Sequence, residues 1–186
     1  MEIMRLVVTG SVGAGKSTFI RSVSEIAVVD TDRIATHETA AIKKKTTVAM
    51  DFGRLQFAPQ MALHLYGTPG QSRFDFMWDI LIKKAHAYIL LVDAHRPSDF
   101  QACRRIYAFM QQRVNIPLIV GLTHMDCQGA WSEENVAIAL GFVDEEKRPP
   151  FVTLNANQKE SVVDALIVLM QHYVEGIQSR ELGIGN

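Results

Sequence analysis

The sequence has few cysteines, no long hydrophobic run and almost no net charge. Its two cysteines, Cys103 and Cys127, are too few for a disulfide framework and lack the paired spacing of a zinc site. No apolar segment approaches the roughly 18 residues that a membrane span needs, and the N-terminus lacks the charged-then-apolar pattern of a signal peptide. A formal charge of -1 in 186 residues provides no bulk attraction for nucleic acid. We therefore expect a soluble, cytoplasmic protein that recognises its ligands through a local site and does not bind nucleic acid.

The composition is that of an ordinary packed domain. Hydrophobic residues make up 48% of the chain and charged residues 21%, which excludes the disordered and collagen-like classes. The sequence contains no internal repeat and no low-complexity linker. We predict a single domain over residues 1–176, followed by a short tail over residues 177–186.

Apolar runs typical of strands alternate with segments of helical spacing. The run Ile3–Thr9 is too short for a helix and predicts a strand buried on both faces. Two alternating runs on either side of a turn at residues 58–60 predict a hairpin, whereas the polar stretch 30–47 predicts a long exposed loop. Further strands are expected at 87–92, 116–122 and 151–154, and helices at 16–24, 98–113, 133–140 and 160–175. This alternation is typical of an open α/β sheet.

Residues 10–17 match the phosphate-binding pattern G-x-x-x-x-G-K-[ST], directly after a strand and at the start of a helix. Gly10, Gly13 and Gly15 allow the backbone N–H groups to wrap a polyphosphate. Lys16 supplies a positive charge to the β- and γ-phosphates, and the Ser17 hydroxyl is a ligand for Mg²⁺. The predicted nucleotide contacts of this phosphate loop are Gly10, Gly13, Ala14, Gly15, Lys16, Ser17 and Thr18.

With the later motifs included, the chain resembles the Ras-like small GTPases over nearly its whole length. Residues 47–52 resemble the segment with the switch-one threonine, and residues 68–74 resemble the start of switch two. Residues 123–126 stand in the place of the guanine motif Asn-Lys-x-Asp, and residues 155–157 resemble the Ser-Ala-Lys base loop. The resemblance implies a mixed, six-stranded, mostly parallel sheet with helices on both faces.

The resemblance also implies roles around the phosphates. Thr47 and Ser17 would coordinate Mg²⁺, and Gly70 would present its N–H to the γ-phosphate. Gln71 would orient the attacking water. Catalysis is then expected from Gln71, Lys16 and Thr47, mainly by positioning and charge stabilisation.

Recognition of the base is expected to depend on Asp126. A carboxylate can accept hydrogen bonds from both N1–H and the exocyclic amine of guanine, a pair of donors that adenine does not offer. The Thr123 hydroxyl can tie the base loop to the phosphate loop, whereas His124 offers less aliphatic stem than lysine to lie along the base. The remaining predicted base-loop contacts are Asn155, Ala156, through its backbone N–H, and Asn157.

Two departures from the small-GTPase pattern bear on the metal and on the branch of the family. Gly67 stands where most small GTPases have an aspartate that supports the hydration shell of Mg²⁺, so metal affinity is in question, with Asp51 and Asp93 as possible replacements. The form Thr-Pro-Gly-Gln at residues 68–71 resembles bacterial Ras-like GTPases, especially the conservon type of actinomycetes and more distantly the Mgl-type polarity GTPases. That resemblance implies a small roadblock-type activator as a partner.

We therefore expect a GTP/GDP-dependent molecular switch that hydrolyses GTP to GDP and phosphate. Loops at residues 31–47 and 67–78 would be held by the γ-phosphate and released after hydrolysis, so that an effector protein can distinguish the two states. The sequence identifies no internal arginine finger, since the candidates Arg33, Arg54 and Arg73 cannot be ranked. Turnover should therefore be slow without an activating partner.

Two other functions stay open. The run Tyr88–Asp93 has the form of a Walker B strand, which is typical of a P-loop ATPase or small-molecule kinase. Gly67 and His124 would also suit a nucleotide-dependent scaffold with little hydrolysis. Glu2 after Met1 and a tail without a terminal cysteine exclude the myristoylation and prenylation motifs, so we expect no lipidation and no direct membrane insertion.

Overall fold

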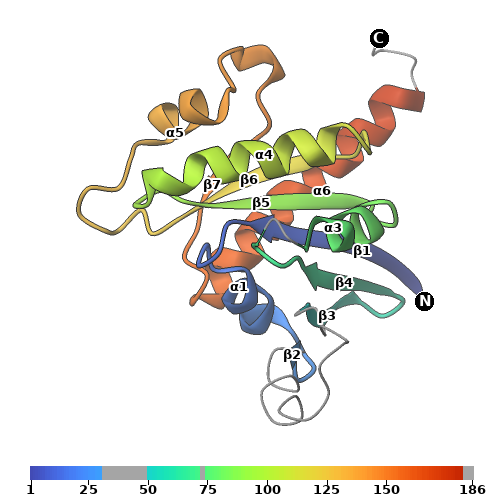
Figure 1. Ribbon diagram of the computed structural model, residues 1–186. Helices are drawn as coiled ribbons and strands as arrows, with labels where there is room; N and C mark the ends of the chain where they lie inside the picture. The colour runs from blue at the N-terminus through green and yellow to red at the C-terminus, as the bar shows by residue number, and fades with distance from the viewer. Residues whose placement is uncertain (31–49, 72–73, 182–186) are drawn as a thin grey trace.

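The computed structural model describes residues 1–30, 50–71 and 74–181, which form one sheet with helices on both of its faces (Figure 1). The seven strands are β1 (Glu2–Gly10), β2 (Val29–Asp30), β3 (Asp51–Ala58), β4 (Met61–Gly67), β5 (Ala87–Asp93), β6 (Leu118–Thr123) and β7 (Phe151–Thr153). The α-helices are α1 (Lys16–Val23), α3 (Asp75–Ile82), α4 (Phe100–Gln111), α5 (Glu133–Leu140) and α6 (Lys159–Glu181), with 3-10 turns η2 (Pro97–Asp99) and η3 (Glu145–Lys147).

The strands follow the order β2-β3-β4-β1-β5-β6-β7 across the sheet. Neighbours from β4 to β7 are parallel, whereas β3 runs antiparallel to β4 and forms the predicted hairpin with it. The mixed, mostly parallel sheet predicted from the sequence is therefore confirmed. It has one strand more than the six expected, because Val29 and Asp30 pair with the start of β3.

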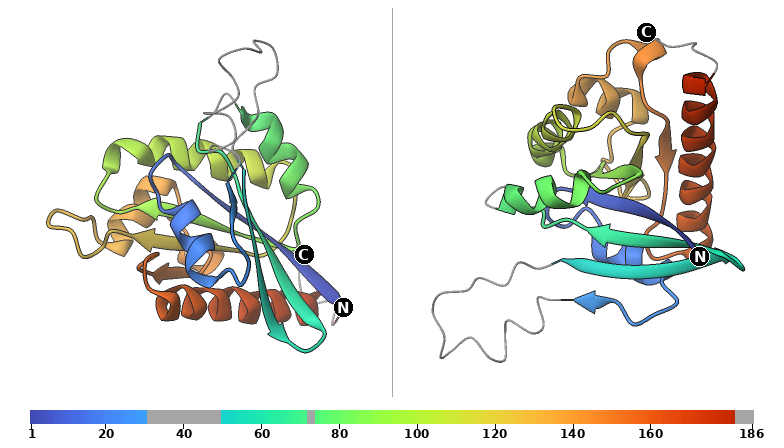
Figure 2. Two further views of the ribbon diagram at one scale, coloured as in Figure 1. Left: turned by 90° about the horizontal axis from the view of Figure 1, so that it is seen from below. Right: turned by 90° about the vertical axis from the view of Figure 1, so that its right-hand side faces the viewer.

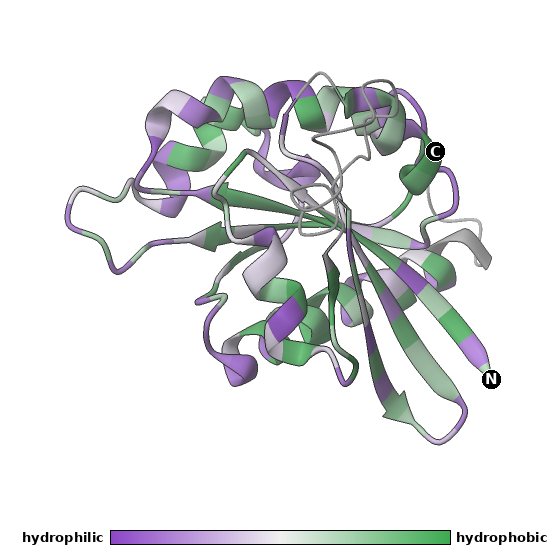
Figure 3. Ribbon diagram, turned by 60° about the horizontal axis from the view of Figure 1, so that its bottom comes forward, coloured by the Kyte–Doolittle hydropathy of each residue, from purple (hydrophilic) through white to green (hydrophobic). Residues whose placement is uncertain are grey.

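Two hydrophobic cores lie on opposite faces of the sheet, because alternate residues of each central strand point to opposite sides. Leu6 and Val8 of β1 pack into the core under α1 and α6, whereas Val7 packs into the core under α3, α4 and α5. Figure 2 shows α6 and α4 on opposite sides of the sheet. In Figure 3 the strands are hydrophobic over much of their length, with hydrophilic bands such as those near the N-terminus, where β1 carries Glu2 and Arg5. This two-sided burial explains the continuous apolar runs of the sequence.

Helix α3 corrects the expectation that residues 67–78 form a loop, because residues 75–78 are its first turn. Trp78 and Ile82 of α3 are buried at helical spacing, but the exposed side chains of Phe76 and Ile80 between them hide this period in the sequence. The Trp78 indole Nε1–H donates to the carbonyl oxygen of Pro69 over 2.7 Å. The helix thus anchors the segment that leaves β4.

The C-terminal helix is longer than expected. Helix α6 continues past residue 176 to Glu181, so that it crosses the expected boundary between domain and tail. Among the described residues, no helix combines the length and the apolar character needed to cross a membrane.

Gly121 in the middle of β6 provides a test of the packing. A Cβ atom there would lie 2.7 Å from Leu91 Cδ2 and 2.8 Å from Leu154 Cδ2. We expect Gly121→Ala to lower the free energy of unfolding by about 1–3 kcal/mol through overpacking, measured by urea denaturation. The matched control is Gly176→Ala in α6, where the nearest atom is 3.7 Å away and alanine should raise stability by about 0.5–1 kcal/mol. Parental stability of Gly121→Ala would contradict this description of the core.

Candidate nucleotide-binding site

The loops that follow β1, β4, β5, β6 and β7 meet at one edge of the sheet, since the carboxyl ends of parallel strands lie together. The sequence motifs predicted to bind nucleotide are carried by these loops. The edge therefore holds the candidate site.

The phosphate loop has the backbone that its glycines were expected to allow. Gly13 and Gly15 have φ angles of 80° and 97°, in the left-handed region that side chains rarely adopt. Gly10 packs so closely on the carbonyl of Leu91 that a Cβ atom there would overlap with it. Gly15 is the N-cap of α1, so no side chain caps this helix, and its first turn has no acidic residue. The N-terminal N–H groups of α1 are therefore suited to an anion.

Lys16 places a charged amine inside this loop. Its Nζ donates to the carbonyl oxygens of Gly10 and Ser11, over 2.9 and 2.6 Å. Burial lowers the pKa of Lys16 to about 8, although the negative charge of Asp51 acts in the opposite direction. A phosphate group next to Nζ would stabilise this partly desolvated charge.

Ser17 and Asp51 bring oxygen atoms together beside the phosphate loop. The Ser17 hydroxyl donates to Asp51 Oδ2 over 2.5 Å, from α1 to the start of β3. Hydroxyl and carboxylate oxygens are ligands suited to Mg²⁺, which also takes phosphate oxygens and water. The donor set at Ser17 therefore fits the metal that the resemblance implies.

The segment after β4 lies over the phosphate loop. A Cβ atom on Gly70 would come within 2.7 Å of the backbone N of Val12, so only glycine fits this close approach. Gln71 follows with an exposed side chain, and its carbonyl accepts the N–H of Phe74 over 3.1 Å. The segment is fixed by the Thr68 hydroxyl, which donates to Thr9 Oγ1 over 2.8 Å. Thr47, the predicted switch-one residue, lies outside the described residues.

The loops after β6 and β7 contact the phosphate loop as well. The Thr123 hydroxyl donates to the carbonyl oxygen of Ala14 over 3.1 Å, which is the connection expected from the sequence. A Cβ atom on Gly15 would lie 3.4 Å from the methyl group of Ala156. Asn155 shapes its own loop, since its Oδ1 accepts the N–H of Asn157 over 3.0 Å. The end of β6 is thus hydrogen-bonded to the phosphate loop, and the loop after β7 packs beside Gly15.

Asp126 and His124 differ in their surroundings. Asp126 is exposed in the loop that follows β6. His124 has a φ of 58°, and its Nδ1 lies 3.3 Å from Oδ2 of Asp93, a buried residue at the end of β5. Asp93 also accepts the N–H of His95 over 3.0 Å. The structure therefore places Asp93 beside His124 in the loop after β6, whereas Asp51 contacts Ser17 of the phosphate loop.

Arg96 lies against the phosphate loop, a position that no sequence motif indicates. Its Nη1 donates to the carbonyl oxygen of Val12 over 3.3 Å and lies 2.9 Å from the position of a Cβ atom on Gly13. Two carboxylates on the same turn, those of Asp93 and Asp99, lie 3.7 and 3.6 Å from its guanidinium. The run Asp93-Ala94-His95-Arg96 after a strand gives no sign that the arginine bends back onto another loop.

The arginines named from the sequence are placed differently. Arg33 and Arg73 lie outside the described residues. Arg54 donates from Nη2 to Sδ of Met1 over 3.3 Å, at the amino end of β1, opposite the phosphate loop. In this conformation Arg54 therefore does not lie where an internal arginine finger would act.

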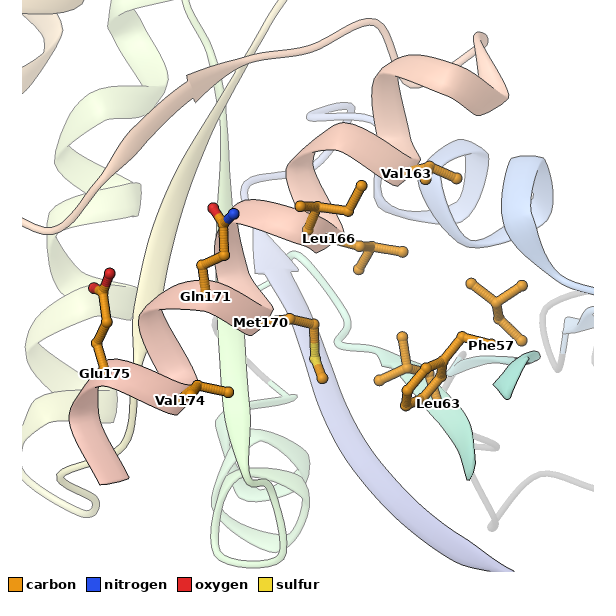
Figure 4. Close-up of a pocket in the computed structure, with 10 residues that line it drawn as sticks. Phe57, Leu63, Val163, Leu166, Met170, Gln171, Val174 and Glu175 are labelled. Carbon is orange, nitrogen blue, oxygen red and sulfur yellow. The ribbon is translucent and has the colours of Figure 1, made fainter. Parts of the chain in front are cut away.

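An apolar pocket of about 470 Å³ lies away from these loops, between the β3–β4 hairpin and α6 (Figure 4). It is lined by side chains such as Phe57, Leu63, Leu166 and Met170. None of the predicted nucleotide contacts lines it, and its apolar surface is unsuited to phosphate groups. The pocket is therefore distinct from the candidate site.

Fold and site together define the class: a P-loop nucleotide-binding protein with a Ras-like α/β fold. The small GTPase Arl6 (BBS3) of Trypanosoma brucei, solved with the nucleotide analogue GppNp, superposes with a TM-score of 0.70 at 16% identity, covering 94% of this chain and 99% of that chain. This similarity shows the fold.

The family is shown by a sequence model described as "conserved hypothetical ATP binding protein", which matches residues 27–176. The chain belongs to this family. The uncharacterized protein MJ1339 of Methanocaldococcus jannaschii is 31% identical over 93 residues, which are 50% of this chain and 53% of that protein. The match thus spans about half the length of this relative.

Thr123 offers a direct test of the contact between base loop and phosphate loop. Thr123→Val keeps the shape but leaves the Ala14 carbonyl without its donor, at a cost of about 1–2 kcal/mol, so bound nucleotide should dissociate roughly tenfold faster. Thr123→Ser keeps the hydroxyl and should stay near the parental rate. Stopped-flow release of a fluorescent nucleotide measures both. Equal rates for the valine and serine variants would show that the hydrogen bond does not hold the site together.

Proposed function

We propose that this protein is a small GTPase that acts as a GTP/GDP-dependent switch. The observation that carries the proposal is the hydrogen bond from Thr123 to Ala14, which holds the loop of Asp126 against the phosphate loop. A ligand that reaches from the phosphate loop to this loop is a nucleotide whose base meets a carboxylate. A polyphosphate alone would not need the second loop.

Guanine suits Asp126 better than adenine does. Guanine presents N1–H and an exocyclic amine, which match the two oxygens of an ionised carboxylate, whereas adenine offers an acceptor at N1. Bound adenine would leave the carboxylate without these partners. When a bound ligand encloses the carboxylate, a site of this kind can reject the wrong ligand by roughly 10⁴-fold.

The hydrolysis proposed here depends on positioning and on charge. Lys16, the N–H groups of α1 and the N–H of Gly70 would hold the phosphates, and Gln71 would orient the attacking water. Ser17 and Thr47 would hold Mg²⁺, which supplies charge neutralisation at the phosphates when bound. The exposed position of Gln71 supports slow turnover until a partner orders its side chain.

An adenine nucleotide is the second candidate ligand, because the family to which the chain belongs is described as ATP binding. The Walker B interpretation of Asp93 has less support, since its carboxylate is engaged by the His95 N–H and lies beside His124 and Arg96. The Ser17 hydroxyl donates to Asp51 instead. A nucleotide-dependent scaffold with little hydrolysis is the third possibility, distinguished by its failure to release phosphate.

We place the protein with the bacterial conservon-type GTPases, in the cytoplasm, with a roadblock-type activator and a separate effector. The support is the Thr-Pro-Gly-Gln segment at 68–71. The GTP-binding domain is proposed to span residues 1–176.

Asp126 provides the test of base recognition. Asp126→Asn presents an amide donor to the guanine amine, so GTP affinity should fall by several kcal/mol, roughly 10²-fold or more, as for a broken charged pair. Xanthosine triphosphate, which has a carbonyl at position 2, should gain affinity. Competition against a fluorescent nucleotide measures both changes. A parent that prefers ATP, or a variant that keeps the parental preference for GTP, would contradict guanine recognition.

Gln71 provides the test of catalysis. Because Gln71 is proposed to act in the transition state, Gln71→Leu should slow phosphate release roughly tenfold or more in single turnover and leave nucleotide affinity nearly unchanged. Gln128→Leu, at an exposed glutamine of the loop after β6, is the matched control and should keep the parental rate. Equal turnover of parent and Gln71→Leu would remove Gln71 from the mechanism, and no turnover in the parent would favour the scaffold.

A further inference from the structure

Gly67 and Asp51 face each other across two neighbouring strands. Gly67 is the last residue of β4, Asp51 is the first residue of the antiparallel strand β3, and their Cα atoms are register partners. The small-GTPase pattern has its metal-supporting aspartate at the position of Gly67. Among the described residues, the carboxylate nearest to that position belongs to the strand beside it.

The side chain of Asp51 fills the space that a side chain at position 67 would need. A Cβ atom on Gly67 would lie 3.1 Å from Asp51 Cβ and 3.2 Å from Asp51 Oδ2. On its other side it would lie 3.0 Å from Ile20 Cδ1. Such distances are tighter than ordinary carbon contacts. The absence of a side chain at Gly67 therefore leaves the space that the Asp51 side chain occupies.

The carboxylate of Asp51 is also directed at the expected metal ligand. Its Oδ2 accepts the hydroxyl proton of Ser17 over 2.5 Å, a short charge-assisted hydrogen bond. A serine that donates its proton in this way keeps its oxygen lone pairs for a cation. The carboxylate adds negative charge next to that oxygen, and groups that orient and polarise a metal ligand in this way raise metal affinity.

We propose that Asp51 on β3 does the work of the absent β4 aspartate and supports a divalent cation at Ser17. This inference deepens the proposed function and rests on nucleotide binding at the phosphate loop, but it does not depend on which base is bound. Asp51 acts as a positioning residue through Ser17. Asp93, the other candidate from the sequence, lies beside His124 in the loop after β6, and among the described residues its partners do not include Ser17.

The experiment measures how fast a fluorescent diphosphate nucleotide leaves the full-length protein as free Mg²⁺ is varied, with EDTA as the metal-free reference. Asp51→Asn and Asp51→Ala should need roughly 10- to 100-fold more Mg²⁺ for half-maximal retention of nucleotide. Their metal-free dissociation rates should stay near that of the parent, which also shows that the phosphate loop is folded. Asp144→Asn, at an exposed aspartate, makes the same chemical change away from Ser17 and should leave the Mg²⁺ dependence unchanged.

Moving the carboxylate back across the strands is the sharper test. The double variant Asp51→Gly with Gly67→Asp removes the close contacts with the Asp51 side chain, leaving those with the flexible end of Ile20, and returns an aspartate to β4. It should therefore recover most of the Mg²⁺ affinity lost in Asp51→Gly. Gly67→Asp alone adds a second carboxylate in a filled space and should not improve on the parent. Recovery in the double variant separates a specific carboxylate role from a general effect on folding.

The same titration separates a failure of the Asp51 inference from a failure of guanine recognition. The titration is run with the guanine and the adenine diphosphate, so a preference for adenine would overturn guanine recognition while the effect of Asp51 could still be measured. A parental Mg²⁺ dependence in Asp51→Asn, or a parent whose nucleotide retention does not respond to Mg²⁺, would overturn the inference.

Discussion

The hydrogen bond from the Thr123 hydroxyl to the Ala14 carbonyl joins parts of the chain that lie 109 residues apart. It depends on the sheet register, because Thr123 ends β6 opposite Asp93 of β5, and Leu91 of β5 in turn lies opposite Gly10 of β1. β5 and β6 thus end at the same level, and β1 ends two residues before them. This register brings the phosphate loop after β1 next to the loop after β6.

Charges around this contact are arranged in two pairs. Lys16 and Arg96 both donate to carbonyl oxygens of the phosphate loop, whereas Asp51 contacts Ser17 and Asp93 lies beside His124. Buried or partly buried charges are tolerated when each finds a partner of opposite sign or a hydrogen bond. Bound phosphate and metal would add charge of both signs to this arrangement. The site is therefore suited to a nucleotide with its cation.

The sequence predicted the elements whose pattern is local. The phosphate loop, the continuous buried strands and the β3–β4 hairpin were recognisable because glycine spacing and apolar periodicity report backbone conformation directly. Helix α3 was missed because Phe76 and Ile80 are exposed apolar residues. Strand β2, with two residues, is too short to show any period.

The contacts of the site were harder to predict, because they depend on register. The sequence left Asp51 and Asp93 as equal candidates for the aspartate absent from position 67, and only the pairing of β3 with β4 places Asp51 beside Gly67. Arg96 returns to the phosphate loop across 84 positions of sequence, which no local pattern indicates. The Thr123 hydrogen bond was predictable because Thr123 begins the motif at residues 123–126, and the first residue of that motif is expected to tie its loop to the phosphate loop.

The central claim is that the chain binds a guanine nucleotide. The most direct measurement is to purify the full-length protein without added nucleotide, denature it and identify the released nucleotide by ion-exchange chromatography against standards. GDP or GTP in a ratio approaching one per chain is the predicted result. ADP or ATP in that ratio would contradict the account, since Asp126 would then not select the base.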